Sequence, residues 1–173
     1  ESPYSLRADS MVGVYFYSKS LWLDFKINEK QTNQVWKVHG QSELGKPLTL
    51  KLYDSANNLL ATQPSDKRGA FYISDLKLSV GSYLLELISQ DSSTAIIEVA
   101  NTGEFVSGNE AEPNNNLKIA NQIKVGETII GKLSGNTDED SFVFNVNDEL
   151  SQKQLKLSII NDNKENLRFC LWA

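Results

Sequence analysis

A two-residue period of hydrophobicity runs through most of the chain and favours β-structure. In LWLDFKI (21–27), the apolar Leu21, Leu23 and Phe25 alternate with more polar positions such as Asp24. Successive side chains of a strand point to opposite faces, so this pattern predicts a strand with one face in a core. Further strands are predicted at 12–17, 34–40, 48–54, 69–76, 82–89 and 94–100, with 55–61 as a turn leading into a short strand.

No segment carries a helical stripe bounded by caps, so the sequence predicts an all-β fold. Residues 1–103 are predicted to form an immunoglobulin-like sandwich, and the polar residues 104–109 a linker. Residues 110–173 are predicted to form a second β-sandwich in tandem, which is truncated or completed by another chain pairing through the C-terminal strand. The strands expected in it are 128–133, 141–146, 154–160 and 167–173.

The composition argues against several classes of protein. Lys and Arg number 17 against 22 Asp and Glu, for a net charge of −5, which speaks against nucleic acid because phosphate binding needs a basic face. No apolar run is long enough to span a membrane. The single cysteine, Cys170, excludes an intrachain disulfide, and its neighbours in RFCLWA predict a small buried hydrophobe.

Catalytic motifs are missing from the sequence. His39 is the only histidine, and a lone histidine on a predicted strand is expected at a surface or edge. It makes no zinc site of the usual kind, and no G-x-S-x-G elbow accompanies it. An independent small hydrolase would have to rely on His39, so the prediction is that the chain is not an enzyme.

Two acidic segments predict a metal site. GNEAEPNNN (108–116) and GNTDED (135–140) each carry two carboxylates two residues apart, which share a face if the backbone is extended. Four carboxylates facing one another would repel unless a cation lay between them, and calcium accepts carboxylate and amide oxygens. The alternative is a pair of independent solvated loops. The carboxylates are Glu110, Glu112, Asp138 and Asp140.

The stretch EAEPNNNLKIANQIKVGETIIGKLSGNTDEDSFVFNV (110–146) resembles the bacterial pre-peptidase C-terminal domain family. The resemblance rests on the Glu-Pro-Asn-Asn opening, the Ala-Asn segment, the Gly-x-Leu strand and the Asp-Ser-Phe-x-Phe after the acidic turn. The family implies a non-catalytic β-sandwich appended to secreted bacterial proteins, often peptidases. Some members resemble the collagen-binding domains of clostridial collagenases, where the opening linker and acidic turn hold calcium. Carried over by position, the implied ligands are Glu110, Glu112, Asn114, Asn115, Asp138 and Asp140.

The resemblance leads to a functional expectation. The chain is expected to be a non-catalytic structural or binding module of an exported bacterial protein, stiffened by calcium at the domain boundary. It would be secreted, periplasmic or on the cell surface. The alternative is an accessory segment that targets a secreted peptidase to its substrate. The first half looks like a generic bacterial immunoglobulin-like sandwich, and fold alone does not assign function.

Trp22 is the candidate for a binding surface in the first half. It shares a strand face with Asp24 and Lys26, opposite the apolar face, so it is expected to point outward. An exposed tryptophan marks a surface for a protein or polysaccharide ligand. The alternative for Trp22 is packing between sheets or domains.

Overall fold

The computed structural model describes residues 4–7, 10–16, 19–133, 138–161 and 167–171. Parts of three predicted segments lie outside these ranges: residue 17, residues 135–137 of the acidic turn, and residues 172–173. The elements are β1 (Tyr4–Ser5), β2 (Ser10–Phe16), β3 (Ser20–Ile27), η1 (Glu29–Gln31), β4 (Gln34–Ser42), η2 (Glu43–Gly45), β5 (Thr49–Tyr53), β6 (Leu59–Pro64), β7 (Ala70–Leu76), β8 (Gly81–Ile88), β9 (Ser93–Glu104), β10 (Asn121–Gln122), β11 (Phe142–Val143) and α1 (Asp148–Ser151). Within the described residues, no helix is long and apolar enough to cross a membrane.

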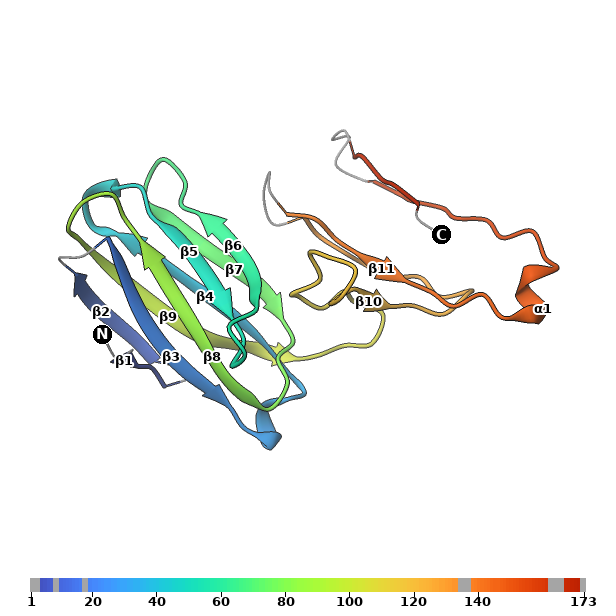
Figure 1. The fold of residues 1–173 in the computed structure, drawn as a ribbon, viewed down its shortest axis with the longest axis horizontal. Coiled ribbons are helices and arrows are strands. Elements are labelled where there is room, and N and C mark those ends of the chain that lie inside the picture. The colour runs from blue at the N-terminus through green and yellow to red at the C-terminus, as the bar shows by residue number, and fades with distance from the viewer. Residues whose placement is uncertain (1–3, 8–9, 17–18, 134–137, 162–166, 172–173) are drawn as a thin grey trace.

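Two sheets pack face to face in the first part of the chain (Figure 1). One has the strand order β1-β3-β8-β5-β6 and the other β2-β9-β4-β7. The long pairs are antiparallel, and the two-residue β1 runs parallel to β3. The predicted all-β fold and the strands predicted between residues 12 and 100 are confirmed, with ends shifted by a few residues.

The core lies between the inner faces of these sheets. β3 alternates strictly, with Leu21, Leu23, Phe25 and Ile27 buried and the residues between them more exposed. Trp36, from β4, is fully buried on the opposite sheet. The period-two pattern therefore places one apolar face of each strand against the other sheet, where burial of these side chains supplies the main stabilisation.

The second part of the chain contains little paired structure among its described residues. β10 and β11 form a two-residue parallel pair, and the predicted strand 128–133 is reduced to a bridge between Ile130 and Asn109. The predictions of strands at 154–160 and 167–171 are wrong, since these residues carry no strand pairing. A strand exists only where its backbone finds a partner, and apolar alternation does not reveal whether one is present. The boundaries 1–103, 104–109 and 110–173 stay a prediction.

Cys170 is exposed, which makes the prediction of a buried cysteine wrong. Its apolar neighbours Phe169 and Leu171 are 66% and 70% exposed, so nothing covers this segment within the described structure. Apolar neighbours in the sequence predict burial, but a residue is buried only where other residues pack against it.

A core substitution tests the sandwich. Leu85, in the centre of β8, is fully buried, whereas its neighbour Leu84 points to the outer face and is partly exposed. Leu85→Ala should lower the free energy of unfolding by about 2–5 kcal/mol, because it leaves a cavity in the core. Urea unfolding measures this. Leu84→Ala is the matched control and should lower the free energy of unfolding clearly less. Equal losses would contradict the placement of Leu85 on the inner face and Leu84 on the outer face.

Candidate metal centre

The segment 108–115 is clamped by backbone hydrogen bonds on two sides. On one side, Glu112 lies beside the end of β7: its N–H donates to Asp75 O at 2.8 Å, and Lys77 N–H donates to Glu112 O at 2.7 Å. On the other side, Glu110 N–H donates to Ile130 O at 2.9 Å. The polar stretch is therefore not a solvated linker, because its backbone is paired both to the sandwich and to the following segment.

This clamp carries acidic side chains into the interior. Glu110 and Glu112 are only 6% and 5% exposed, and Asn114 is fully buried. Asp140 lies at the end of the turn before β11. The bond from Ser141 N–H to Asn114 O, at 3.0 Å, holds this turn against the segment 108–115. Glu110, Glu112 and Asp140 each offer a carboxylate oxygen, and these three atoms all lie within 4.8 Å of one another.

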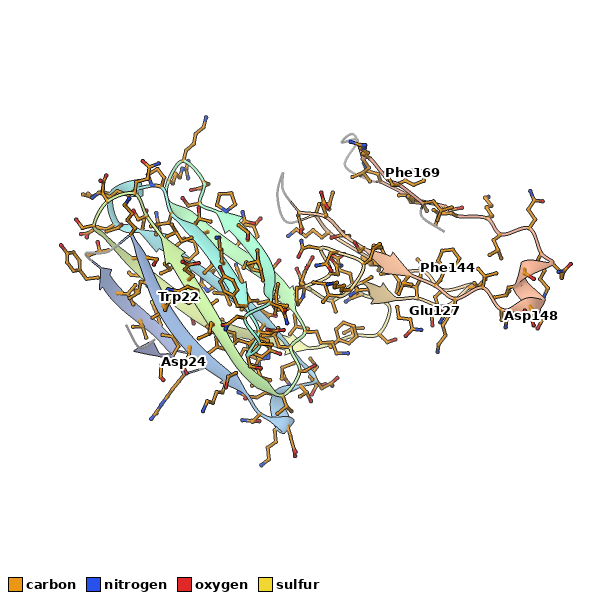
Figure 2. The ribbon with its side chains drawn as sticks, in the orientation of Figure 1. Trp22, Asp24, Glu127, Phe144, Asp148 and Phe169 are labelled. Atoms are coloured by element: carbon orange, nitrogen blue, oxygen red, sulfur yellow. The ribbon has the colours of Figure 1, made fainter. Side chains whose placement is uncertain are left out.

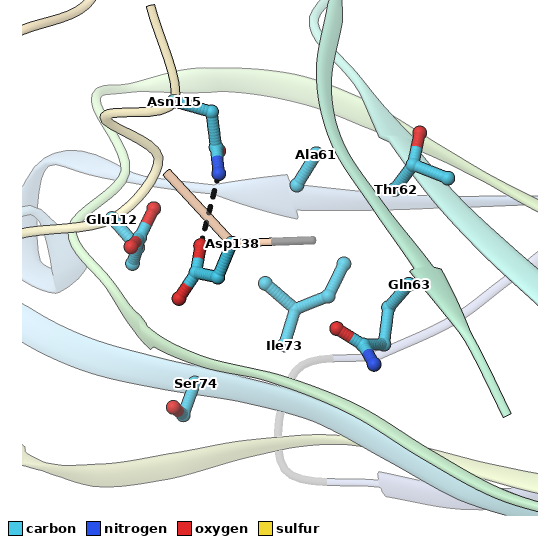
Figure 3. Close-up of a pocket in the computed structure, with 8 residues that line it drawn as sticks. All are labelled: Ala61, Thr62, Gln63, Ile73, Ser74, Glu112, Asn115 and Asp138. Atoms are coloured by element: carbon cyan, nitrogen blue, oxygen red, sulfur yellow. Dashed lines mark hydrogen bonds between the residues drawn. The ribbon is translucent and has the colours of Figure 1, made fainter. Parts of the chain in front are cut away.

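Asn115 and Asp138 lie next to this cluster. Asn115 Nδ2 donates to Asp138 Oδ1 at 3.0 Å, and both residues face β6 and β7 across a small cavity (Figure 3). The cavity has a volume of about 20 Å³, which is room for one water molecule. The structure thus brings together all six residues that the sequence predicted for the site, and their role as ligands stays a prediction.

Several oxygens of this cluster have no hydrogen-bond partner. Buried polar atoms are normally satisfied, so each exception calls for a partner of another kind. Among the described residues, neither salt bridge involves the three clustered carboxylates. The unpartnered buried atoms are Glu110 Oε2, Glu112 Oε1, Asn114 Oδ1, Asn115 Oδ1 and Asp140 Oδ1. A proton shared between Glu110 and Asp140 would satisfy part of this set. When the carboxylates are ionised, an oxygen-liganded cation would complete all of it.

Electrostatics agree with this geometry. Burial, assisted by the neighbouring Asp140, raises the pKa of Glu110 to about 8, although the N–H of Lys132 bonds to it. Burial and the charge of Asp138 raise the pKa of Glu112 to about 7. Burial also raises the pKa of Asp140. Without a cation, the cluster holds protons at a pH where ordinary carboxyl groups are ionised.

Two residues that support the site were not singled out from the sequence. Asn121 accepts from Ala111 N–H at 2.8 Å and donates to Ala111 O at 2.7 Å, fixing the backbone between the two glutamates. At Gly131, an added Cβ would lie 2.6 Å from Glu110 Oε2, so only glycine leaves room for that carboxylate. Both residues belong to the Ala-Asn and Gly-x-Leu elements of the motif, which were the available signal.

Trp22 and His39 lie away from this cluster. Trp22 projects from the outer face of β3 as predicted, and its ring centre lies 5.4 Å from that of Tyr53, whose hydroxyl donates to Glu86 Oε2 at 2.9 Å (Figure 2). Trp22 is half-buried by this packing, and a role as a binding surface stays a prediction. His39 pairs across strands with Glu98, at 3.3 Å between Nε2 and Oε2.

Comparisons with known proteins give structural likenesses only. No family model and no curated protein matches the chain. Among solved structures, the pre-peptidase C-terminal domain of a collagenase from Bacillus anthracis matches with a TM-score of 0.49 and 13% identity, over 57% of this chain and 95% of that one. A Glycosylation Associate Protein (Gap123) complex from Streptococcus agalactiae matches with a TM-score of 0.32 and 14% identity, over 81% and 56% of the chains. A β-glucosidase from Paenibacillus barengoltzii matches with a TM-score of 0.29 and 13% identity, over 54% and 11%.

The collagenase domain belongs to the family that residues 110–146 resemble. The resemblance predicted from the sequence is therefore confirmed by a solved structure of that family. With TM-scores below 0.5, the three likenesses assign neither a function nor a site to this chain.

The raised pKa values predict how the metal-free protein responds to pH. In the folded state the pKa values of Glu110 and Glu112 are about 8 and 7, whereas in the unfolded chain both carboxyl groups ionise near pH 4.5. The folded state therefore binds more protons between these limits, and its stability falls as pH rises from about 5 to about 8.

Thermal unfolding of metal-free protein across this pH range measures the effect. Glu110→Gln combined with Glu112→Gln removes two of the three carboxyl groups with raised pKa values, and the pH slope of Tm should become shallower than in the unsubstituted protein. If the slope of Tm against pH is unchanged in the double variant, Glu110 and Glu112 are not the groups that cause the pH dependence.

Proposed function

We propose that this chain is a non-catalytic module of an exported protein in which a calcium ion braces the segment 108–115 against the first sandwich. The observation that carries the proposal is the set of five buried, unpartnered oxygens from two glutamates, two asparagines and an aspartate. The ligand atoms are all oxygens, whereas zinc favours nitrogen and sulfur ligands. Several carboxylates and amide carbonyls from the protein suit calcium, because magnesium usually keeps several waters and binds only one or two carboxylates.

The proposed ligand residues come from two separated segments. Glu110, Glu112 and Asn114 lie on 108–115, and Asp140 is the last residue of the acidic turn. Asn115 and Asp138, bonded to each other, complete the set. Calcium would supply positive charge where the carboxylates otherwise repel one another. It would also connect the acidic turn to the segment 108–115.

The mechanical consequence follows from the backbone pairing of Glu112. Because Glu112 is bonded to Asp75 and Lys77, a cation held by its side chain is anchored to the end of β7. Lys77 Nζ also lies 3.8 Å from the centre of the Phe105 ring, which holds the start of the linker beside the same strand end. Calcium would thus set the direction in which the second part of the chain leaves the sandwich and lower the entropy of the connection.

Calcium-dependent unfolding tests the proposal. With calcium about 100-fold above its Kd, binding adds about 2.7 kcal/mol to stability, which should raise Tm by roughly 5–10 °C for a chain of this size. Thermal melts in millimolar calcium, in millimolar magnesium and in chelator measure the shift. The double variant Glu112→Ala, Asp140→Ala should lose it.

Glu139→Gln is the matched control, because Glu139 lies in the same turn between Asp138 and Asp140 but is exposed. This variant should keep the calcium response. Identical melts of the unsubstituted protein with calcium and with chelator would contradict a calcium site, as would an equal response to magnesium.

Gly131→Ala tests the site without changing any charge. The added methyl group overlaps Glu110 Oε2 and displaces that carboxylate from the cluster. Calcium affinity should fall by about 10–100-fold, as for other losses of ligand support. Isothermal titration calorimetry measures it. The control is Gly13→Ala in β2, outside the cluster, where an added Cβ has open space and the backbone is not in the left-handed region; equal affinity losses in the two variants would contradict the role of Gly131.

A further inference from the structure

The two sheets have four edges, and three of them are protected against pairing with another chain. β1 is only two residues long, and β3 behind it carries the charged side chains of Asp24 and Lys26. β6 ends in Pro64, and its pairing with β5 contains a register shift. β7 is partly covered by the segment 108–115, which bridges to it at Glu112. Short length, proline, irregularity and a covering segment are the usual devices that prevent edge-to-edge association.

β2 carries none of these devices. It lies at the end of its sheet, in the part of the chain that the structure describes, and it pairs with β9 over seven residues without a shift. Its sequence, SMVGVYF, contains no charge and no proline. Such an edge presents a row of backbone donors and acceptors to solvent, and it is a template for another strand.

Both faces of β2 are apolar at this edge. Met11 and Tyr15 point to the outer face and are 63% and 54% exposed. Val12 and Val14 point to the inner face, where they pack against the core but are only partly buried. A strand added beside β2 would cover apolar surface on both faces.

The pattern of β2 is symmetric about Gly13, its central residue. In an antiparallel pair of two β2 strands with a twofold axis at Gly13, Met11 lies opposite Tyr15 of the partner subunit, and Val12 opposite Val14 of the partner subunit. Apolar side chains therefore meet apolar side chains at four of the five central positions, and such cross-strand pairs stabilise a sheet. Gly13 leaves open space at the axis. This self-complementarity is what a twofold interface requires.

We propose that the protein pairs with a second copy of itself through β2, in an antiparallel contact centred on Gly13 that joins two four-stranded sheets into one. The occupant is a second copy rather than an unrelated peptide because the apolar pattern matches itself in reverse order. The contact is one strand wide, so the dimer is weak and depends on concentration. It is independent of the metal centre, which lies near the end of β7, the opposite edge of the same sheet.

Sedimentation velocity over about 1–300 µM, the range of weak transient interfaces, tests association. The protein should shift from monomer to dimer, equally in calcium and in chelator. Gly13→Lys places two like charges at the axis and should abolish the dimer. Ile96→Lys adds the same charge to the same outer face on β9, behind the edge, and should leave most of the dimer intact. Melting curves show whether each variant is folded.

A monomer throughout the range would overturn the proposal. A dimer that survives Gly13→Lys would also overturn it, because association would then use another surface, such as the exposed apolar side chains of 155–171.

Disulfide trapping tests the register in a Cys170→Ser background. Gly13→Cys should form a linked dimer by itself, because Cα atoms facing each other at the axis lie within disulfide reach. Met11→Cys alone should link poorly, whereas a mixture of Met11→Cys and Tyr15→Cys chains should link to each other. Efficient linking of Met11→Cys alone, or none by Gly13→Cys, would overturn the centred antiparallel register.

Discussion

Buried negative charge is the constraint on which the second part of this chain depends. Backbone bonds to Ile130 and to Asp75 hold the main chain of Glu110 and Glu112 in place, and both side chains are buried. Burying unpaired carboxylates costs several kcal/mol each, and the protein meets that cost with protons or with a cation. The raised pKa values and the unpartnered oxygens are two consequences of this single arrangement.

The first sandwich supplies the rigid end of that arrangement. The buried Leu76 fixes the last residue of β7 in the core, and the next backbone N–H, that of Lys77, binds Glu112. The second part offers few contacts of its own, since its described strands are two residues long. Its position relative to the sandwich therefore rests mainly on the segment 108–115, and a ligand bound there acts on the whole second part.

The sequence predicted the elements whose pairing is regular and missed those that depend on distant partners. Alternation located β3 and β8, because each has an apolar face and two neighbours. The same alternation at 154–160 predicted a strand that has no partner in the structure. At the site, the two-residue spacing placed Glu110 and Glu112 on one face, but Asn121 and Gly131 act across turns. Their contacts with Ala111 and Glu110 are seen only in the three-dimensional structure.

Amide hydrogen exchange with and without calcium is the most direct test of the proposed calcium brace. Calcium should slow exchange in peptides covering 108–116 and 138–143, which carry the proposed ligands, and leave β4 and β8 unchanged because their amides are already bonded within the sandwich. Equal exchange at 108–116 in both conditions, or slowing spread evenly over the chain, would contradict a cation that acts as a local brace between the segment 108–115 and the sandwich.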